Sequence, residues 1–253
     1  MTTIYTVLAY LALATFWVGL GYRVWTWVET PVPLKIPTTP APKTLPGVIA
    51  RMAGEVLIFR SLFTSDRALW LGSWLFHGGL LLILLRHLRY FLYPVPDWVL
   101  ALQPVGVLAG IVFLIAAAYL VLRRIVLLPV RAISLFSDYF AILLLLSIAA
   151  TGLLMKFVSP VDLLAVKAFV LGLVTLAPAP VPENALFLVH FSLALLLIAY
   201  FPFSQLVHAG GIFLSPTRNQ RDDARLRRYV NPWDRQPPPQ SSPASRGGSE
   251  ARG

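Results

Sequence analysis

The chain has 253 residues, of which 57% are hydrophobic and only 13% are charged, with a formal net charge of +10. A soluble domain carries about a quarter charged residues, whereas here apolar residues form blocks of about 18 or more, as a bilayer core requires. Cysteine is absent, which excludes disulfides, thiolate-ligated iron–sulfur clusters and covalent c-type haem. The Lys and Arg residues cluster between the apolar blocks and in the tail. This distribution is typical of charges that fix the orientation of a membrane protein, and it argues against nucleic acid binding.

Five apolar blocks predict an all-α integral membrane protein, a bundle of five transmembrane helices within residues 1–214. The predicted spans cover about residues 4–28, 68–93, 98–122, 135–158 and 183–208. Residues 215–253 form a basic, Pro-rich tail whose composition predicts partial disorder.

The connections between the blocks carry shorter features. A Pro-rich loop follows the first span, and Val48–Phe63 predicts an amphipathic helix on the membrane surface or against a partner. Ser65 and Asp66 are candidate N-caps of the second span. The apolar stretch at 161–176 is too short to span, which predicts an interfacial or re-entrant segment.

The distribution of positive charge predicts the orientation. The first loop has five Lys and Arg residues, the second none, the third three, the fourth two and the tail eight. With five spans, this alternation predicts that the N-terminus lies outside the cell and the tail in the cytoplasm. The expected location is the inner (cytoplasmic) membrane.

All four histidines of the chain lie in two predicted spans, His77 and His87 in the second and His190 and His208 in the fifth. An imidazole in a membrane is costly without a partner. The two spans run in opposite directions, so His77 and His208 lie toward the cytoplasm, and His87 and His190 toward the outside. Two cross-helix pairs at two depths are what bis-histidine ligation of two b haems requires. The alternative is that each histidine donates a hydrogen bond across a helix interface.

Two features bear on this interpretation. The histidine separations are about 15 Å on the second span and about 27 Å on the fifth, if both are continuous helices. A bend at Pro202 would reduce the mismatch. Four glycines near the histidines either leave room for a porphyrin edge or serve helix packing and termination; they are Gly78, Gly79, Gly210 and Gly211.

These histidine spacings, ten residues in the second span and eighteen in the fifth, resemble those of the cytochrome b (gamma) subunit of respiratory nitrate reductase, over roughly Ile4 to His208. That resemblance implies two haem b groups with His77 paired with His208 and His87 with His190. The Pro-rich loop and the runs 55–60 and 67–77 are also similar to the membrane cytochromes of heterodisulfide-reductase-type complexes, including that of the Dsr complex of sulfur-metabolising prokaryotes. This likeness implies a cytoplasmic iron–sulfur partner subunit, room for further membrane or periplasmic subunits, and coupling of the quinone pool to sulfur metabolism.

The sequence departs from the nitrate reductase pattern at the quinol site, where that family has a basic residue early in the third helix. Residues 98–107 contain no Lys or Arg here. Local candidates near the outer haem are Arg86, Asp97 and Lys156, each of which could instead be an interfacial anchor. Candidate partners of the haem propionates are Arg86 and Arg89 outside, and Arg123 and Arg131 inside.

The predicted function is electron transfer between quinone or quinol and a partner subunit, with no catalytic side chain. Two other classes remain open. A transporter could use intramembrane histidines as ligands, although the spans contain almost no carboxylates and the chain only three methionines. A cofactor-free membrane anchor is the third class, but an anchor does not need two depth-matched histidine pairs.

Overall fold

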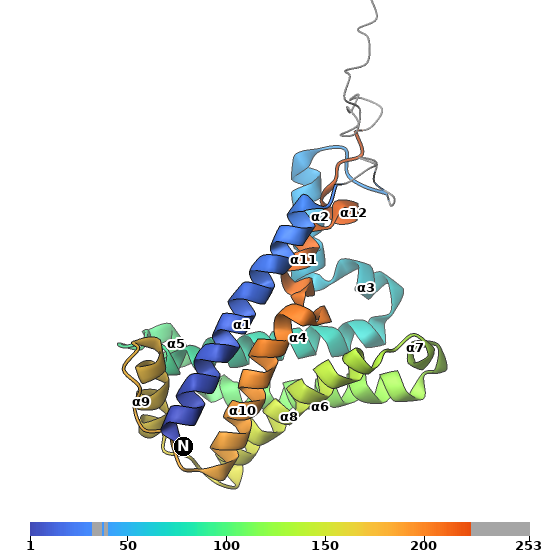
Figure 1. Cartoon of the computed structure of the whole chain (residues 1–253). Coiled ribbons are helices and arrows are strands. Elements are labelled where there is room, and N and C mark those ends of the chain that lie inside the picture. Colours follow the sequence, from blue (N-terminus) through green and yellow to red (C-terminus); the bar gives the residue numbers. More distant parts are fainter. Residues whose placement is uncertain (32–36, 38–39, 224–253) are drawn as a thin grey trace, which may run out of the picture.

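The computed structural model describes residues 1–31, 37 and 40–223, and within them it contains helices, turns and no strand (Figure 1). Five helical segments of the described residues are long and apolar enough to cross a membrane. They are α1 (Thr2–Glu29), α4 (Arg67–His87) with the 3-10 turn that extends it to Tyr90, α6 (Gln103–Val126), α8 (Phe136–Phe157), and α10 (Ala185–Tyr200) with the 3-10 turn that extends it to Phe203. The prediction of an all-α multi-pass membrane bundle is confirmed. The predictions for the tail beyond residue 223 and for residues 32–36 and 38–39 lie outside the described residues.

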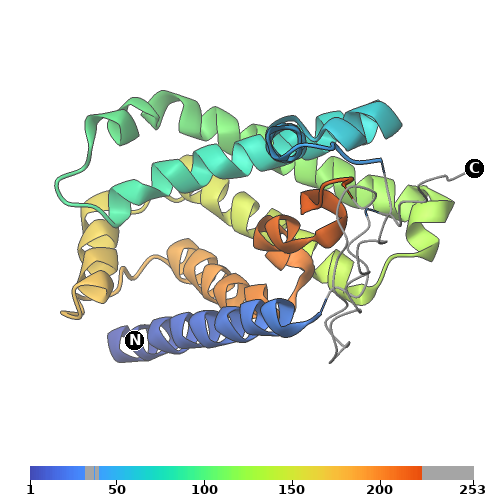
Figure 2. The ribbon, with the colours of Figure 1, turned by 90° about the horizontal axis from the view of Figure 1, so that it is seen from above.

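The five long helices pack in a chain of neighbours. α4 packs on α6, α6 on α8, α8 on α10, and α10 on α1. Figure 2 shows α4 and α6 along one side of the molecule and α1 and α10 along the other, with α8 between them. The two long helices that carry histidines, α4 and α10, are not one of the closely packed pairs. The bundle therefore brings them to face each other without pressing their backbones together.

The contact between α4 and α6 depends on residues spaced by seven along α4. A Cβ on Gly72 would stand 2.5 Å from the Tyr119 ring, and one on Gly79 would stand 3.0 Å from the Cβ of Phe113. One heptad further on, the Arg86 side chain fills the space beside Gly106. At each of these positions, a glycine on one helix leaves room for a large side chain of the other, as is usual where membrane helices pack closely.

The short elements gather at the two ends of the bundle (Figure 1). One end, called the α2 end below, carries α2 (Leu45–Ile58), α3 (Arg60–Ser65), α7 (Leu128–Ala132), α11 (His208–Leu214) and α12 (Pro216–Asn219). The other end, called the α9 end, carries the 3-10 turn η1 (Leu88–Tyr90), α5 (Asp97–Ala101) and α9 (Leu163–Val174). At 12 residues α9 is too short to span, as expected for this segment.

Three expected helices are interrupted. The amphipathic helix over 48–63 is two helices, because Phe59 adopts the left-handed conformation between α2 and α3. The helix over 98–122 is divided at Leu102, and Pro104 lies in the first turn of α6, where proline is tolerated. The helix over 183–208 ends at Tyr200 and continues as the 3-10 turns η2 (Phe201–Phe203) and η3 (Gln205–Val207). Pro202 in η2 has no N–H for a helical hydrogen bond, which explains this end.

Asp66 is the N-cap of α4, as expected for one of the two candidates. Its Oδ1 accepts a hydrogen bond of 2.9 Å from the Leu69 N–H, and its Oδ2 lies 2.7 Å from the Arg123 guanidinium at the end of α6. The Leu69 N–H, together with Arg123, lowers the pKa of Asp66. The cap therefore stays ionised and ties the start of α4 to the end of α6 at the α2 end.

Candidate functional site

The structure brings His77 and His208 together. His77 lies near the middle of α4, His208 is the first residue of α11, and their ring centroids are 5.9 Å apart with the planes at 86°. The Nδ1 of His77 lies 2.7 Å from the Ser73 carbonyl, and that of His208 lies 2.8 Å from the Gln205 carbonyl. A carbonyl only accepts, so Nδ1 must carry the proton in both rings, and each Nε2 keeps a free lone pair.

His87 and His190 form the second group, nearer the α9 end. His87 is the last residue of α4, and its Nδ1 donates to the Ile83 carbonyl at 2.7 Å. His190 lies in α10, close enough to His87 for their charges to interact. In the described part of the chain these two rings do not touch, unlike those of His77 and His208. In each group, one imidazole comes from α4 and the other comes from the segment that contains α10 and α11.

His190 is held by Thr151 of α8, a residue that the sequence-based prediction missed. The Thr151 Oγ1 lies 2.8 Å from the Ser147 carbonyl, 3.0 Å from the Ile148 carbonyl and 3.0 Å from Nδ1 of His190. The single hydroxyl proton serves a carbonyl, so the oxygen accepts from the His190 Nδ1–H. A Cβ on the neighbouring Gly152 would stand 3.3 Å from the imidazole. The signal in the sequence is a threonine and a glycine together inside an apolar span.

The break in the fifth helix decides where His208 lies. A continuous helix would carry His208 about 27 Å along the axis from His190, which does not match the spacing on α4. Instead the chain leaves helical geometry after Tyr200, and the Ser204 hydroxyl accepts from the Leu206 N–H to start η3. The predicted fifth span is therefore not a continuous helix from His190 to His208, and its break lies at Pro202, where a bend was expected to reduce the mismatch.

The 5.9 Å separation of the His77 and His208 ring centroids is the one expected for two imidazoles that share a metal ion. With metal–nitrogen bonds of about 2.0 Å on opposite sides, the two imidazole centroids lie about 6 Å apart. The described residues contain no group of three or more His, Cys, Asp or Glu that could hold a metal by themselves. Two nitrogen ligands suit a metal whose other ligands come from a macrocycle, as in haem.

The four glycines near the histidines divide between the two roles considered. A Cβ on Gly78 or Gly210 would meet nothing within 4 Å, so open space adjoins both of these glycines. Gly79 packs against Phe113, and a Cβ on Gly211 would stand 3.3 Å from the Trp27 ring. One glycine of each pair leaves space and the other serves packing.

The candidate polar residues differ in their surroundings. Arg86 is half-buried, its charge reaches His87, and its Nε is buried without a hydrogen-bond partner. Arg89 also lies within electrostatic range of His87 and donates to the Gln103 side chain at 3.1 Å. Asp97 and Lys156 are exposed at the α9 end.

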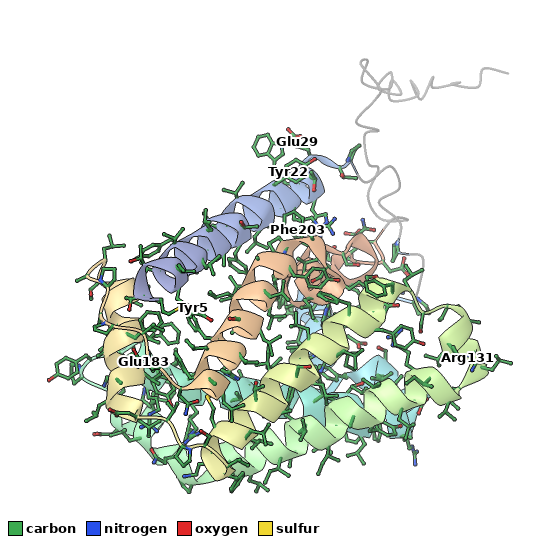
Figure 3. The ribbon with its side chains drawn as sticks, turned by 60° about the horizontal axis from the view of Figure 1, so that its bottom comes forward. Tyr5, Tyr22, Glu29, Arg131, Glu183 and Phe203 are labelled. Atoms are coloured by element: carbon green, nitrogen blue, oxygen red, sulfur yellow. The ribbon has the colours of Figure 1, made fainter. Side chains whose placement is uncertain are left out.

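The two remaining arginine candidates lie at the α2 end, and among the described residues neither makes a direct contact with an imidazole. Arg123 is paired with Asp66, and Arg131 is exposed at the turn beyond α6, where Figure 3 shows it at the edge of the molecule. Arg86 is thus the candidate with the least satisfied side chain.

Comparison with known proteins agrees with the resemblance drawn from the histidine spacing. Residues 47–219 match the family model of the nitrate reductase gamma subunit. The chain is 40% identical to the Hdr-like menaquinol oxidoreductase cytochrome b-like subunit of Archaeoglobus fulgidus, over 90% of this chain and 82% of the relative. The subunit of the same name from Archaeoglobus profundus is 38% identical, over 92% and 83%. The chain therefore belongs to the nitrate reductase gamma subunit family.

Proposed function

We propose that the chain is the dihaem cytochrome b subunit of a quinol-oxidising membrane complex. His77 and His208 would be the axial ligands of one haem b, and His87 and His190 those of the other. The observation that carries the proposal is the arrangement of the imidazoles, in two cross-helix groups at two depths with every Nδ1 hydrogen-bonded. The printed names of the two relatives, cytochrome b-like subunits, support the same assignment.

The hydrogen bonds of the imidazoles explain how the protein would prepare these ligands. An Nδ1–H bonded to a carbonyl or to the Thr151 hydroxyl fixes the tautomer and the ring orientation, and it makes Nε2 a better electron-pair donor. A haem b bound in this way supplies a one-electron redox centre. The protein contributes position, an apolar surrounding and charged groups near the propionates.

Quinol would bind at the α9 end, near His87. The relatives are named menaquinol oxidoreductase subunits, which supports menaquinol as the electron donor. Arg86 supplies an unpartnered, buried N–H beside His87, where an acceptor oxygen of quinol or of a haem propionate would satisfy it. Protons from quinol oxidation would leave on this side of the membrane, which we place outside the cell.

The α2 end would face the cytoplasm and bind the electron-accepting subunit, which we propose to be an iron–sulfur protein in a complex linked to sulfur metabolism. The segment after α11 folds back here, because Arg218 of α12 pairs with Glu55 of α2 at 3.3 Å and the Asp222 N–H donates to the Pro42 carbonyl at 3.0 Å. Exposed arginines on this end would attract an acidic partner; they include Arg60, Arg67 and Arg131.

Anaerobic titration of the purified protein with a reduced menaquinol analogue tests the function. Wild-type protein should show reduction of its b-type absorbance by the quinol, and dithionite should produce little more. His87→Ala should retain one haem that dithionite reduces, while quinol no longer reduces it at the wild-type rate. A wild-type protein that contains haem but is not reduced by quinol would contradict the proposal.

A further inference from the structure

Phe59 stands out at the junction of α2 and α3. Its backbone has φ 51° and ψ 49°, the left-handed region that bulky side chains rarely adopt. Around it Leu57 is 70% exposed and Ile58 54% exposed, whereas Phe59 is half-buried. Its ring centroid lies 5.1 Å from that of His77, with the planes at 83°. The unusual backbone thus turns one aromatic ring out of an exposed segment and onto a candidate ligand.

Two tryptophans of α4 hold this junction in place. The Nε1–H of Trp70 donates to the Ile58 carbonyl at 2.8 Å, and that of Trp74 donates to the Leu57 carbonyl at 3.2 Å. These carbonyls lie in the last turn of α2, where no intrahelical donor follows. Positions 70, 74 and 77 lie on one face of a helix, so the same face of α4 fixes the junction and presents His77.

We infer that Phe59 is a positioning residue that covers His77 from the α2 end, and this inference rests on the proposed function. Its ring limits the rotation of the imidazole plane and keeps water from the His77 side of the haem. Phe76, which is buried in the bundle, also lies 5.1 Å from the His77 ring, so two aromatic rings contact the imidazole. Backbone strain that persists at one residue is expected where the surroundings require that conformation.

The cover has a consequence for redox potential. Oxidation of a bis-imidazole haem adds a positive charge at the iron, and water stabilises that charge. An apolar cover therefore favours the reduced form, and its removal lowers the midpoint potential of the haem that it covers. The haem on His87 and His190 lies at the other depth and serves as a reference in the same molecule.

Potentiometric titration of the b-type absorbance in Phe59→Gly tests the inference. Glycine accepts the left-handed backbone, so the junction is retained while the ring is lost. We expect two haems per chain, with one midpoint potential lowered and the other unchanged. His208→Ala identifies which of the two potentials belongs to the His77–His208 pair.

Three further variants sharpen the result. Phe59→Leu keeps an apolar cover and should shift the potential less than Phe59→Gly. Trp70→Phe, which loses the N–H to Ile58 but keeps an aromatic ring, should lower the same potential slightly. Leu57→Ala is the matched control, because the Leu57 side chain is 70% exposed on the same segment and its main-chain carbonyl, which accepts from Trp74, is kept in the variant.

The outcomes separate the inference from the function on which it rests. Two haems in the wild type, with neither potential changed in Phe59→Gly and Trp70→Phe, would overturn the role of Phe59 and leave the proposed function standing. An equal shift of both potentials would also overturn it. Wild-type protein without haem would remove the proposed function itself.

Discussion

His87 and His190 both lie on long membrane helices, whereas His208 begins the short helix α11, after two 3-10 turns that end the regular geometry of α10. In the first group the support for His190 comes from a third helix, through Thr151 of α8. In the second, the contacts of His77 and His208 include residues of irregular elements, namely Phe59 at the α2–α3 junction and Gln205 in the 3-10 turn η3.

The difference shows two ways to fix a ligand in a bundle. A side chain from a neighbouring helix orients His190 without altering the backbone. His208 is placed instead by the backbone itself, since the chain must break for its ring to reach that of His77 at 5.9 Å. We therefore expect the His77–His208 pair to depend on residues that shape the main chain, and the His87–His190 pair to depend on side-chain contacts.

The largest effect is expected for Pro202→Ala. Alanine allows α10 to continue, which would carry His208 away from His77, because each added helical residue turns the chain by about 100°. Haem content should fall from two per chain toward one, measured by pyridine haemochrome assay. Phe203→Ala is the control, since Phe203 is adjacent but 64% exposed. A full haem content in Pro202→Ala would show that the break does not place the ligand.

Thr151→Val should weaken the other site alone. Valine keeps the shape but removes the oxygen that accepts from the His190 Nδ1–H. Loss of such a supporting bond typically lowers affinity for the metal group by about 10- to 100-fold. Haem retention during dilution or transfer to apomyoglobin would measure the change. Thr175→Val is the matched control, because the Thr175 hydroxyl bonds only the Leu171 carbonyl of its own helix in the described structure. Equal haem loss in both variants would contradict the role of Thr151.

Alanine substitutions at the adjacent Gly78 and Gly79 should affect different properties, haem binding at Gly78 and protein stability at Gly79. Gly79→Ala places a methyl group 3.0 Å from the Phe113 Cβ and 3.2 Å from the Ala109 carbonyl, and overpacking of this kind costs about 1–3 kcal/mol. Gly78→Ala meets open space, so it should leave the thermal stability of the haem-free protein unchanged and weaken only haem binding at His77. Thermal unfolding in detergent, with and without haem, separates the two. Similar losses in both variants would mean that the open space beside Gly78 has no role.

The smallest effect is expected for Arg218→Ala at the α2 end. The Arg218–Glu55 pair is partly exposed, with Arg218 at 37% and Glu55 at 11%, and such pairs contribute about 0–1 kcal/mol. Haem content and potentials should not change, while limited proteolysis should cut the chain after α11 faster. A change in either haem would mean that α12 supports the ligand sites directly.

Much of the fold could be predicted because long apolar blocks and charged loops are direct consequences of the bilayer. All five spans were expected near their observed positions, and Asp66 was expected as a cap. The histidine groups followed from spacing and direction. The boundaries at Phe59 and Leu102 were not predicted, because each depends on how a short segment packs at an end of the bundle, whereas the break after Tyr200 could be expected from Pro202.

Thr151 and Phe59 escaped prediction for a related reason. A threonine inside a span usually bonds its own helix, and only the packing of α8 on α10 brings its oxygen to His190. A phenylalanine in an amphipathic segment gives no sign that its backbone is left-handed. Tertiary contacts decide both cases, and no periodicity in the sequence reports them.

The most direct test of the account is the haem content of purified wild-type protein and of the four single His→Ala variants, combined with dithionite-reduced minus oxidised spectra. We expect a b-type signal of about two haems per chain in the wild type and about one in each variant. His77→Ala and His208→Ala should leave the same remaining spectrum, and His87→Ala and His190→Ala should leave the other. Wild-type protein without haem, or variants that pair differently, would contradict it.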